Sequence, residues 1–118
     1  MSRIGTMDLK GASGKHYTFN VYSFENTFTE KQSGVYVVTH RNVMASGNTD
    51  HALVYAGVSS NLHDTFTDHP LIEEFNKENA NCILAYWEDH PDTRELIRED
   101  LVNLYHPPCN INSEKTIH

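Results

Sequence analysis

The side chains of this chain that could do chemistry stand in three short stretches. Gly34-Val35-Tyr36 comes first, Tyr55-Ala56-Gly57 follows, and a longer stretch runs from Arg98 to Asn110. The two tyrosines carry phenolic hydroxyls, which can donate or accept a proton. Glu99 carries a carboxylate, and one carboxylate can hold Mg²⁺ because this ion keeps several of its waters. Proton transfer and the binding of a divalent cation are therefore the chemistry that these residue types allow.

Each of these residues also has a structural interpretation. Tyr36 and Tyr55 stand in apolar, strand-like runs, where tyrosine is common as a half-buried packing residue. Glu99 falls on the face of a predicted helix that points away from Ile97 and Leu101. A solvated glutamate belongs there, and so does a ligand that faces a cleft. The sequence leaves both interpretations open.

Two further polar residues have comparable alternatives. Asn110 follows Pro107-Pro108 and can hydrogen-bond the chain end back to a sheet. His69 precedes Pro70, which pushes its backbone towards an extended conformation and suits a capping or surface histidine. The eight histidines are scattered, without the HxH or HxxxH spacing of a metal site, so we expect no zinc.

Composition narrows the function classes. Nine Lys and Arg against sixteen Asp and Glu give a net charge of −7, which opposes the approach of nucleic acid unless a local basic patch exists. The sequence has neither an apolar run of roughly 20 residues nor the apolar core of an export signal. Only Cys82 and Cys109 are present, and the first lies in an apolar run. We therefore expect a cytoplasmic protein with reduced thiols and no membrane contact.

Runs of β-branched and aromatic residues predict four strands, at residues 17–24, 35–40, 51–58 and 82–87. The second and third are joined by a loop rich in Gly, Asn, Ser and Asp, with no helix between them, so they should pair antiparallel. The fourth is continuously apolar, which is typical of a buried central strand.

Helical segments are expected near residues 62–69, 71–79 and 92–105. Ser59-Ser60-Asn61 supplies capping side chains for the first, and Pro70 separates it from the second. Asp92 and Glu95 resemble a capping box at the start of the third. The apolar positions of this third helix are spaced to share one face: Ile97, Leu101, Leu104 and Tyr105.

The order of these elements predicts an α+β fold, with a small central antiparallel or mixed sheet flanked by helices. At 118 residues the chain is long enough for one domain. We expect a single domain over residues 16–112, a flexible N-terminal tail over 1–15 and a polar C-terminal tail over 113–118.

The three stretches, in this order and with Ser59-Ser60-Asn61-Leu62 and Pro107-Pro108-Cys109-Asn110, resemble the GIY-YIG nuclease superfamily over roughly residues 34 to 110. The strand at 17–24 would then be an additional N-terminal strand. The resemblance implies phosphodiester hydrolysis with one divalent cation, Mg²⁺ or Mn²⁺, held by Glu99. It also implies that Tyr36 and Tyr55 are the signature tyrosines.

The same resemblance implies supporting roles for two residues, and this chain departs from the family pattern at one position. His69 corresponds to a histidine that some members keep, and Asn110 to an asparagine that braces the site. The family places an arginine ten residues after the second tyrosine, where this chain has Thr65. A missing preorganised donor costs on the order of 10²–10³ in rate. His63 is the nearby candidate cation, and Asp64 beside it would repel a phosphate.

Three functions follow from this departure. The first is a nuclease-like domain with an impaired site that serves as a binding module, for nucleic acid or for a protein partner. The second is an active DNA endonuclease in which His63, Arg41 or Arg98 replaces the arginine. The third is a structural or protein-interaction domain unrelated to nucleic acid.

Overall fold

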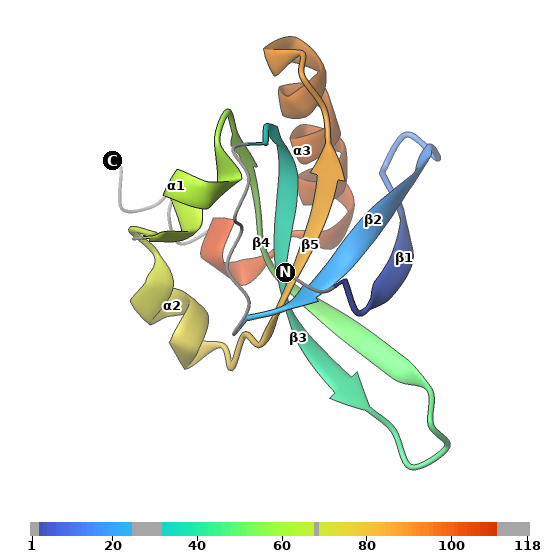
Figure 1. The fold of residues 1–118 in the computed structure, drawn as a ribbon. Helices are drawn as coiled ribbons and strands as arrows, with labels where there is room; N and C mark the ends of the chain where they lie inside the picture. Colours follow the sequence, from blue (N-terminus) through green and yellow to red (C-terminus); the bar gives the residue numbers. More distant parts are fainter. Residues whose placement is uncertain (1–2, 25–31, 68, 111–118) are drawn as a thin grey trace.

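In the computed structural model, residues 3–24, 32–67 and 69–110 are described, and they form one antiparallel sheet with helices on both faces (Figure 1). The sheet has the strand order β1-β2-β5-β3-β4, and each neighbouring pair is antiparallel. The strands are β1 (Gly5–Lys10), β2 (His16–Ser23), β3 (Gly34–Val43), β4 (Thr49–Ser59) and β5 (Cys82–Trp87). The predicted α+β class and antiparallel sheet are confirmed.

Helices α1 (Leu62–Thr67), α2 (Ile72–Lys77) and α3 (Pro91–Tyr105) accompany the strands, and residues 108–110 form a further helical turn. Successive side chains of β3 point to opposite faces of the sheet, and both faces are buried. Val35 and Val37 pack with Ile97 of α3, whereas Tyr36 packs with Phe75 of α2. The long helix therefore covers one face and the two short helices cover the other.

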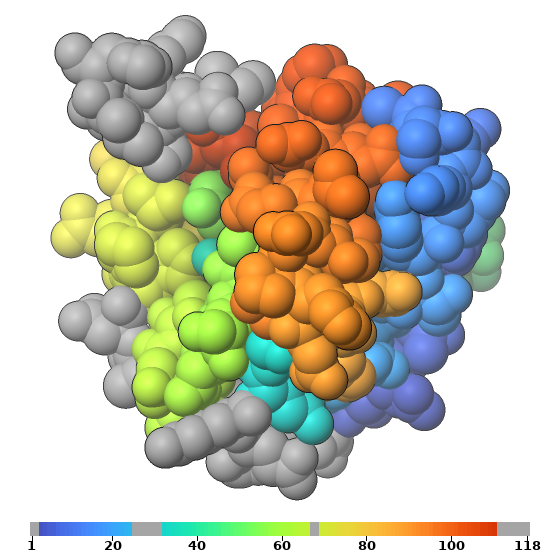
Figure 2. Space-filling view, turned by 90° about the horizontal axis from the view of Figure 1, so that it is seen from above, coloured from blue at the N-terminus to red at the C-terminus, as the bar shows by residue number. Residues whose placement is uncertain are grey.

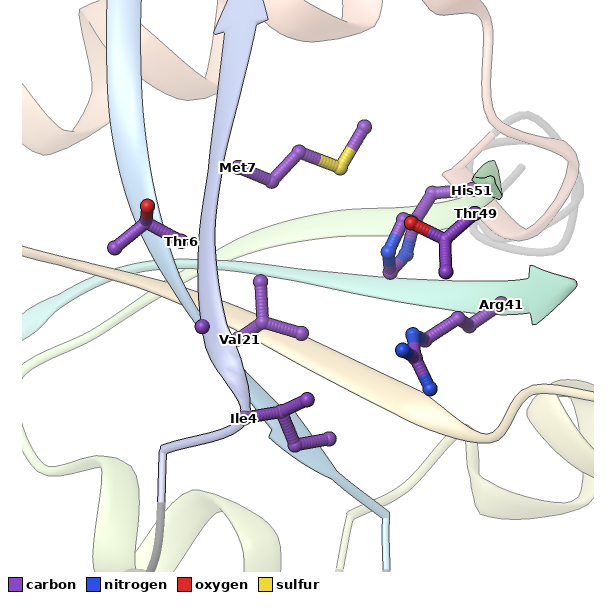
Figure 3. Close-up of a pocket in the computed structure, with 8 residues that line it drawn as sticks. Ile4, Thr6, Met7, Val21, Arg41, Thr49 and His51 are labelled. Atoms are coloured by element: carbon purple, nitrogen blue, oxygen red, sulfur yellow. The ribbon is translucent and has the colours of Figure 1, made fainter. Parts of the chain in front are cut away.

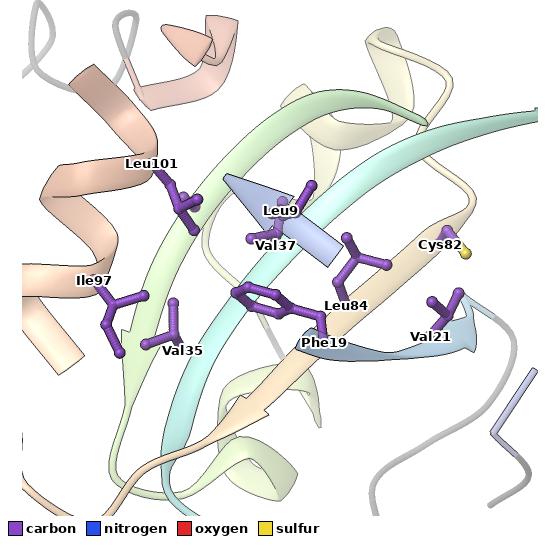
Figure 4. Close-up of a cluster of buried hydrophobic side chains, with 10 residues drawn as sticks. Leu9, Phe19, Val21, Val35, Val37, Cys82, Leu84, Ile97 and Leu101 are labelled. Atoms are coloured by element: carbon purple, nitrogen blue, oxygen red, sulfur yellow. The ribbon is translucent and has the colours of Figure 1, made fainter. Parts of the chain in front are cut away.

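The face beneath α3 holds the larger core. Figure 4 shows Ile97 and Leu101 of α3 above Val35 and Val37 of β3, with Phe19 of β2 beside them. Strand β5 lies in the middle of the sheet, and its first four residues are buried, so the predicted central strand is confirmed. At the centre, each residue of such a strand is removed from water whichever face it points to.

The predicted N-terminal tail over residues 1–15 is wrong for the segment that forms β1. This strand pairs with β2 along its whole length, and its buried Leu9 lies opposite Tyr17. Met7 and Leu9 alternate with polar residues, so the period of two was present but spanned too few residues to stand out. The domain therefore begins before residue 16, and the predicted tail over 113–118 lies outside the described residues.

The hairpin between β1 and β2 is fastened to α3 by one carboxylate. Asp100 accepts hydrogen bonds from the Ser13 backbone N–H at 2.8 Å, the Ser13 hydroxyl at 2.7 Å and the Tyr17 hydroxyl at 2.7 Å. These hydrogen bonds, that of Ser13 first, lower the pKa of Asp100. Gly14, with φ of +89°, makes the turn that brings Ser13 to this position.

Helix α3 differs from its predicted form at two points. It begins at Pro91, with His90 as the N-cap and no side-chain cap, so Asp92 does not cap the helix. Leu104 is 44% exposed, whereas Arg94, which the apolar pattern did not include, is 7% exposed. The Arg94 guanidinium donates to the backbone carbonyls of residues 88 and 89, which explains why a charged side chain is buried there.

Among the described residues, no helix combines the length and apolarity that crossing a membrane requires.

Candidate functional site

Adjacent strands bring Tyr36 and Tyr55 together. Tyr36 of β3 lies opposite Gly57 of β4, and Val38 lies opposite Tyr55, so both tyrosines point to the face covered by α1 and α2. Their ring centroids are 6.0 Å apart. The long β3–β4 ladder, which includes most of the predicted connecting loop, shifts register between Val38 and Thr39. This bulge is of the kind that re-aims side chains next to functional sites.

The glycine of the second signature stretch makes room for the first tyrosine. A Cβ atom at Gly57 would lie 2.5 Å from both Cζ and Oη of Tyr36. The Tyr36 ring therefore lies directly over the β4 backbone, and only a residue without a side chain fits beneath it. Tyr36 is 3% exposed as a result.

His69 is held against Tyr36 in one defined tautomer. Its Nδ1 accepts a hydrogen bond from the Leu71 backbone N–H at 3.0 Å, and its Nε2 lies 2.7 Å from the Tyr36 hydroxyl oxygen. Since a backbone N–H can only donate, Nδ1 carries no proton and Nε2–H donates to Tyr36. Burial lowers the pKa of His69 to about 4, so the ring is neutral at pH 7.

Both tyrosines are protonated at neutral pH. Burial, followed by the neighbouring Tyr55 phenol, raises the pKa of Tyr36 far above its ordinary value. Burial also raises the pKa of Tyr55. Because His69 donates to the Tyr36 oxygen, the hydroxyl proton of Tyr36 is available to Tyr55, and their interaction lowers the pKa of Tyr55. The three side chains thus form a neutral, oriented donor chain.

Helix α3 contributes a charged pair to this group. Arg98 donates from Nε and Nη2 to Oε2 of Glu95, at 2.9 and 2.8 Å. Burial has the largest effect on the pKa of Tyr55. The positive charge of Arg98 lowers this pKa, and the negative charge of Glu95 raises it. The Arg98 side chain is 25% exposed and that of Glu95 is 48% exposed. A partly exposed arginine, held by a carboxylate, therefore lies near enough to Tyr55 for its charge to be felt there.

The structure does not bring Glu99 to the tyrosines. Its side chain is exposed, and within the described residues no hydrogen bond or ion pair joins it to Tyr36, Tyr55 or His69. A helix turns by about 100° per residue, so Glu99 projects from α3 in a different direction from Arg98. Glu95 is the carboxylate beside Tyr55. The three-residue spacing between Glu95 and Arg98 is the sequence signal for this ion pair. The spacing between Asp92 and Glu95 instead favours a helix cap, which the structure does not contain.

The donor set beside Tyr55 does not suit a divalent cation. The Glu95 carboxylate is already paired with Arg98, and a guanidinium repels a metal ion placed next to it. Within the described residues, no three His, Cys, Asp or Glu side chains converge as a metal-binding group. The residues that face the tyrosines are therefore arranged around a fixed guanidinium.

Asn110 braces the edge of the sheet at the site. Its Oδ1 accepts a hydrogen bond from the Ala56 backbone N–H at 2.7 Å, and its Nδ2 donates to the Ala56 carbonyl at 2.8 Å. The amide thus continues the sheet as an additional strand would, directly after Tyr55. Asn110 is 5% exposed, so both hydrogen bonds are shielded from water. The side-chain amide of Asn110 is therefore engaged by the β4 backbone.

The Thr65 side chain forms hydrogen bonds at the start of α1. Its hydroxyl donates to the Asn61 carbonyl at 3.2 Å and lies 2.6 Å from the Ser59 hydroxyl. Asn61 and Asp64 exchange two hydrogen bonds across the first turn, as a capping pair does. His63 faces the same carboxylate, with Nδ1 3.1 Å from Oδ1 of Asp64. His63 therefore accompanies the cap of α1.

Figure 2 shows how these elements lie at the surface. Helix α3 (orange) and the α1–α2 segment (yellow-green) flank a hollow in which the green of β4 is visible. Arg41, the other arginine considered at this site, lines a separate cavity with His51. Of the candidate cations, Arg98 is the one whose charge acts on the pKa of Tyr55.

No protein-family model, curated protein or solved structure matches this chain.

Proposed function

We propose that this chain is a GIY-YIG nuclease-like domain whose site binds a phosphodiester and does not hydrolyse it efficiently. One observation carries the proposal: the guanidinium of Arg98, held by Glu95, lies close enough to Tyr55 for its positive charge to lower the pKa of this phenol. The ordered signature stretches support the family, and the geometry of Tyr36 over Gly57 gives those stretches a physical reason.

The site has the donors that a phosphate group requires. The planar guanidinium of Arg98 uses two of its nitrogens on Glu95, which leaves Nη1 for a ligand. Arginine binds phosphate well because its fixed fork of N–H donors matches two phosphate oxygens. The hydroxyl of Tyr55, oriented by Tyr36 and His69, adds a neutral donor. These groups recognise an anion without the help of a metal.

The same groups are poor catalysts of hydrolysis. Tyr36 has a strongly raised pKa, so it holds its proton at neutral pH and is a weak general base. The position ten residues after Tyr55 is a threonine that is engaged in helix capping. The Glu95 carboxylate, which could otherwise bind a cation, is neutralised by Arg98. Three contributions to phosphodiester cleavage are thus weakened together.

The Glu95–Arg98 pair also favours a second candidate, an active endonuclease that depends on Mg²⁺ or Mn²⁺. In that case Glu95 would bind the metal ion, and Arg98, released from it, would replace the missing arginine. The two candidates make opposite predictions for Glu95. As a metal ligand it is required for activity, whereas as a partner of Arg98 it competes with the bound phosphate.

We expect Arg98→Gln to weaken the binding of a short single-stranded oligonucleotide about tenfold, because one charge-assisted contact is lost. Glu95→Gln is expected to strengthen binding several-fold, since the guanidinium is then free of its carboxylate. The measurement is a titration at low salt in the presence of EDTA, followed by the amide signals of Tyr55 and its neighbours in NMR spectra.

Matched variants keep this experiment interpretable. Glu99→Gln removes the same charge from the same helix, and Arg3→Gln removes a positive charge from an exposed site near β2. Neither is expected to change the affinity more than about twofold if binding is local to Arg98. Equal effects of Glu95→Gln and Glu99→Gln would show that only net charge matters. The absence of any binding by the wild-type protein at low salt would support a structural or protein-interaction role instead.

A further inference from the structure

A second cavity lies away from the tyrosines (Figure 3). It is bounded by the start of β1, the end of β3 and the start of β4. It has a volume of about 230 Å³. It continues from the core beneath α3, since Val21 belongs to that core and also lines the cavity. Its remaining lining residues come from the N-terminal segment and from the β3–β4 hairpin: Ile4, Gly5, Thr6, Met7, Arg41, Thr49 and His51.

The two walls of the cavity differ in chemistry. Ile4, Met7 and Val21 form an apolar wall, and Figure 3 shows Arg41, Thr49 and His51 across from it. Small-molecule sites usually combine an apolar surface with a few convergent polar groups, and this cavity has both. This one is smaller than the roughly 300–1,000 Å³ of most such sites, so it suits one small ligand.

Arg41 is positioned by its backbone, while its guanidinium has no partner among the residues that the structure describes. Its N–H donates to the Asn81 side-chain oxygen at 2.7 Å, and its carbonyl accepts from the Asn81 amide nitrogen at 3.1 Å. Within the described residues, the Arg41 guanidinium has neither a hydrogen bond nor an ion pair. Acidic side chains outnumber basic ones sixteen to nine in this chain, so an arginine without a carboxylate partner is informative.

His51 is oriented by a buried neighbour. Its Nδ1 lies 2.8 Å from the hydroxyl of Thr39, which is fully buried. This contact leaves Nε2 as the ring nitrogen that a ligand can reach. Burial first, and then the nearby charge of Arg41, lowers the pKa of His51, while Asp50 raises it. At neutral pH, Arg41 is therefore the charged group of this wall.

From this geometry we propose that the cavity binds a small carboxylate that carries a short apolar chain. The fork of N–H donors on Arg41 matches the two oxygens of a carboxylate, with Thr49 and His51 beside it. The apolar chain would lie against Ile4, Met7 and Val21, where its removal from water favours binding. The site lies on β1 and on the opposite hairpin, and it does not depend on the function proposed for the tyrosine site.

The test is an NMR titration of the full chain with hexanoate, compared with hexanamide and inorganic phosphate. Hexanoate is expected to shift the amide signals of residues 4–7, 41 and 49–51. Hexanamide, which has the same chain and no charge, should bind about tenfold more weakly. Phosphate, which has charge and no chain, should bind more weakly too. Binding of phosphate as tight as that of hexanoate would overturn the assignment of an apolar chain.

Variants locate the site. Arg41→Gln should weaken hexanoate binding about tenfold, and Thr49→Val should weaken it by a smaller factor. Lys77→Gln removes an equal charge from the exposed end of α2, outside both sites, and serves as the matched control that should leave hexanoate binding unchanged. Unchanged spectra of the free variants away from residues 4–7, 41 and 49–51 would establish that they fold. Equal hexanoate affinity in the wild-type protein and Arg41→Gln, or shifts confined to residues near Tyr55, would contradict the proposal.

Discussion

Replacing Gly57 with alanine is expected to lower the free energy of unfolding by about 1–3 kcal/mol, the usual range for overpacking a filled core. The added methyl group would meet the Tyr36 ring at 2.5 Å, so the ring must move. Moving the ring also breaks the 2.7 Å contact between the Tyr36 hydroxyl and His69. Urea denaturation measures the first effect, and the NMR signals of the His69 ring measure the second.

Gly5→Ala is the matched control for this substitution. Gly5 also lies in a strand, but a Cβ atom there has nothing within 4 Å, and its backbone is not in the left-handed region. Its effect on the free energy of unfolding should stay within about 0.5 kcal/mol. If Gly57→Ala were as stable as Gly5→Ala and left the His69 signals in place, the packing of Tyr36 on β4 would be incorrect.

Acidification is expected to destabilise the protein through His69. Burial lowers the pKa of His69 from 6.5 to about 4, so between these values the unfolded chain binds more protons than the folded protein. Stability therefore rises with pH in this window, is fully present above pH 6.5, and falls as the pH is lowered towards 4. Allowing for partial solvent screening, the loss attributable to His69 is on the order of 2 kcal/mol.

Urea unfolding of the wild-type protein and of His69→Gln, at pH 7 and at pH 4.5, isolates this contribution. Glutamine cannot be protonated in this range, and carboxyl groups titrate in both proteins, so the difference between them reports His69. The wild-type protein should lose more stability on acidification than His69→Gln. Parallel losses in the two proteins would mean that His69 is not held neutral by its surroundings, and that its tautomer is not fixed by Leu71.

Much of the fold follows from local sequence patterns. The apolar run at 82–87 predicts a central strand because only burial on both faces permits such a run, and the structure confirms it. The direct connection between β3 and β4 predicts their antiparallel pairing. Strand β1 escaped prediction because its apolar alternation, Met7 and Leu9 among polar residues, spans too few residues to stand out.

The candidate site was predictable only in part. Tyr36, Tyr55 and Asn110 stand in recognisable stretches, and the structure brings the two tyrosines together with His69 beside them. The choice between Glu95 and Glu99 depends on which side of α3 faces β4. Helical periodicity gives the angle between positions but not the direction of the helix over the sheet. That direction is set by the burial of side chains across the domain.

The central claim, that the site binds a phosphodiester without cutting it efficiently, is tested most directly by one cleavage assay. Plasmid and branched DNA are incubated with Mn²⁺ and the wild-type protein or Glu95→Gln, and nicking is followed over time. A binding site built around Arg98 predicts no cleavage above background by either protein. Cleavage that requires Mn²⁺, occurs with the wild-type protein and disappears in Glu95→Gln would contradict the claim and establish a metal-dependent nuclease.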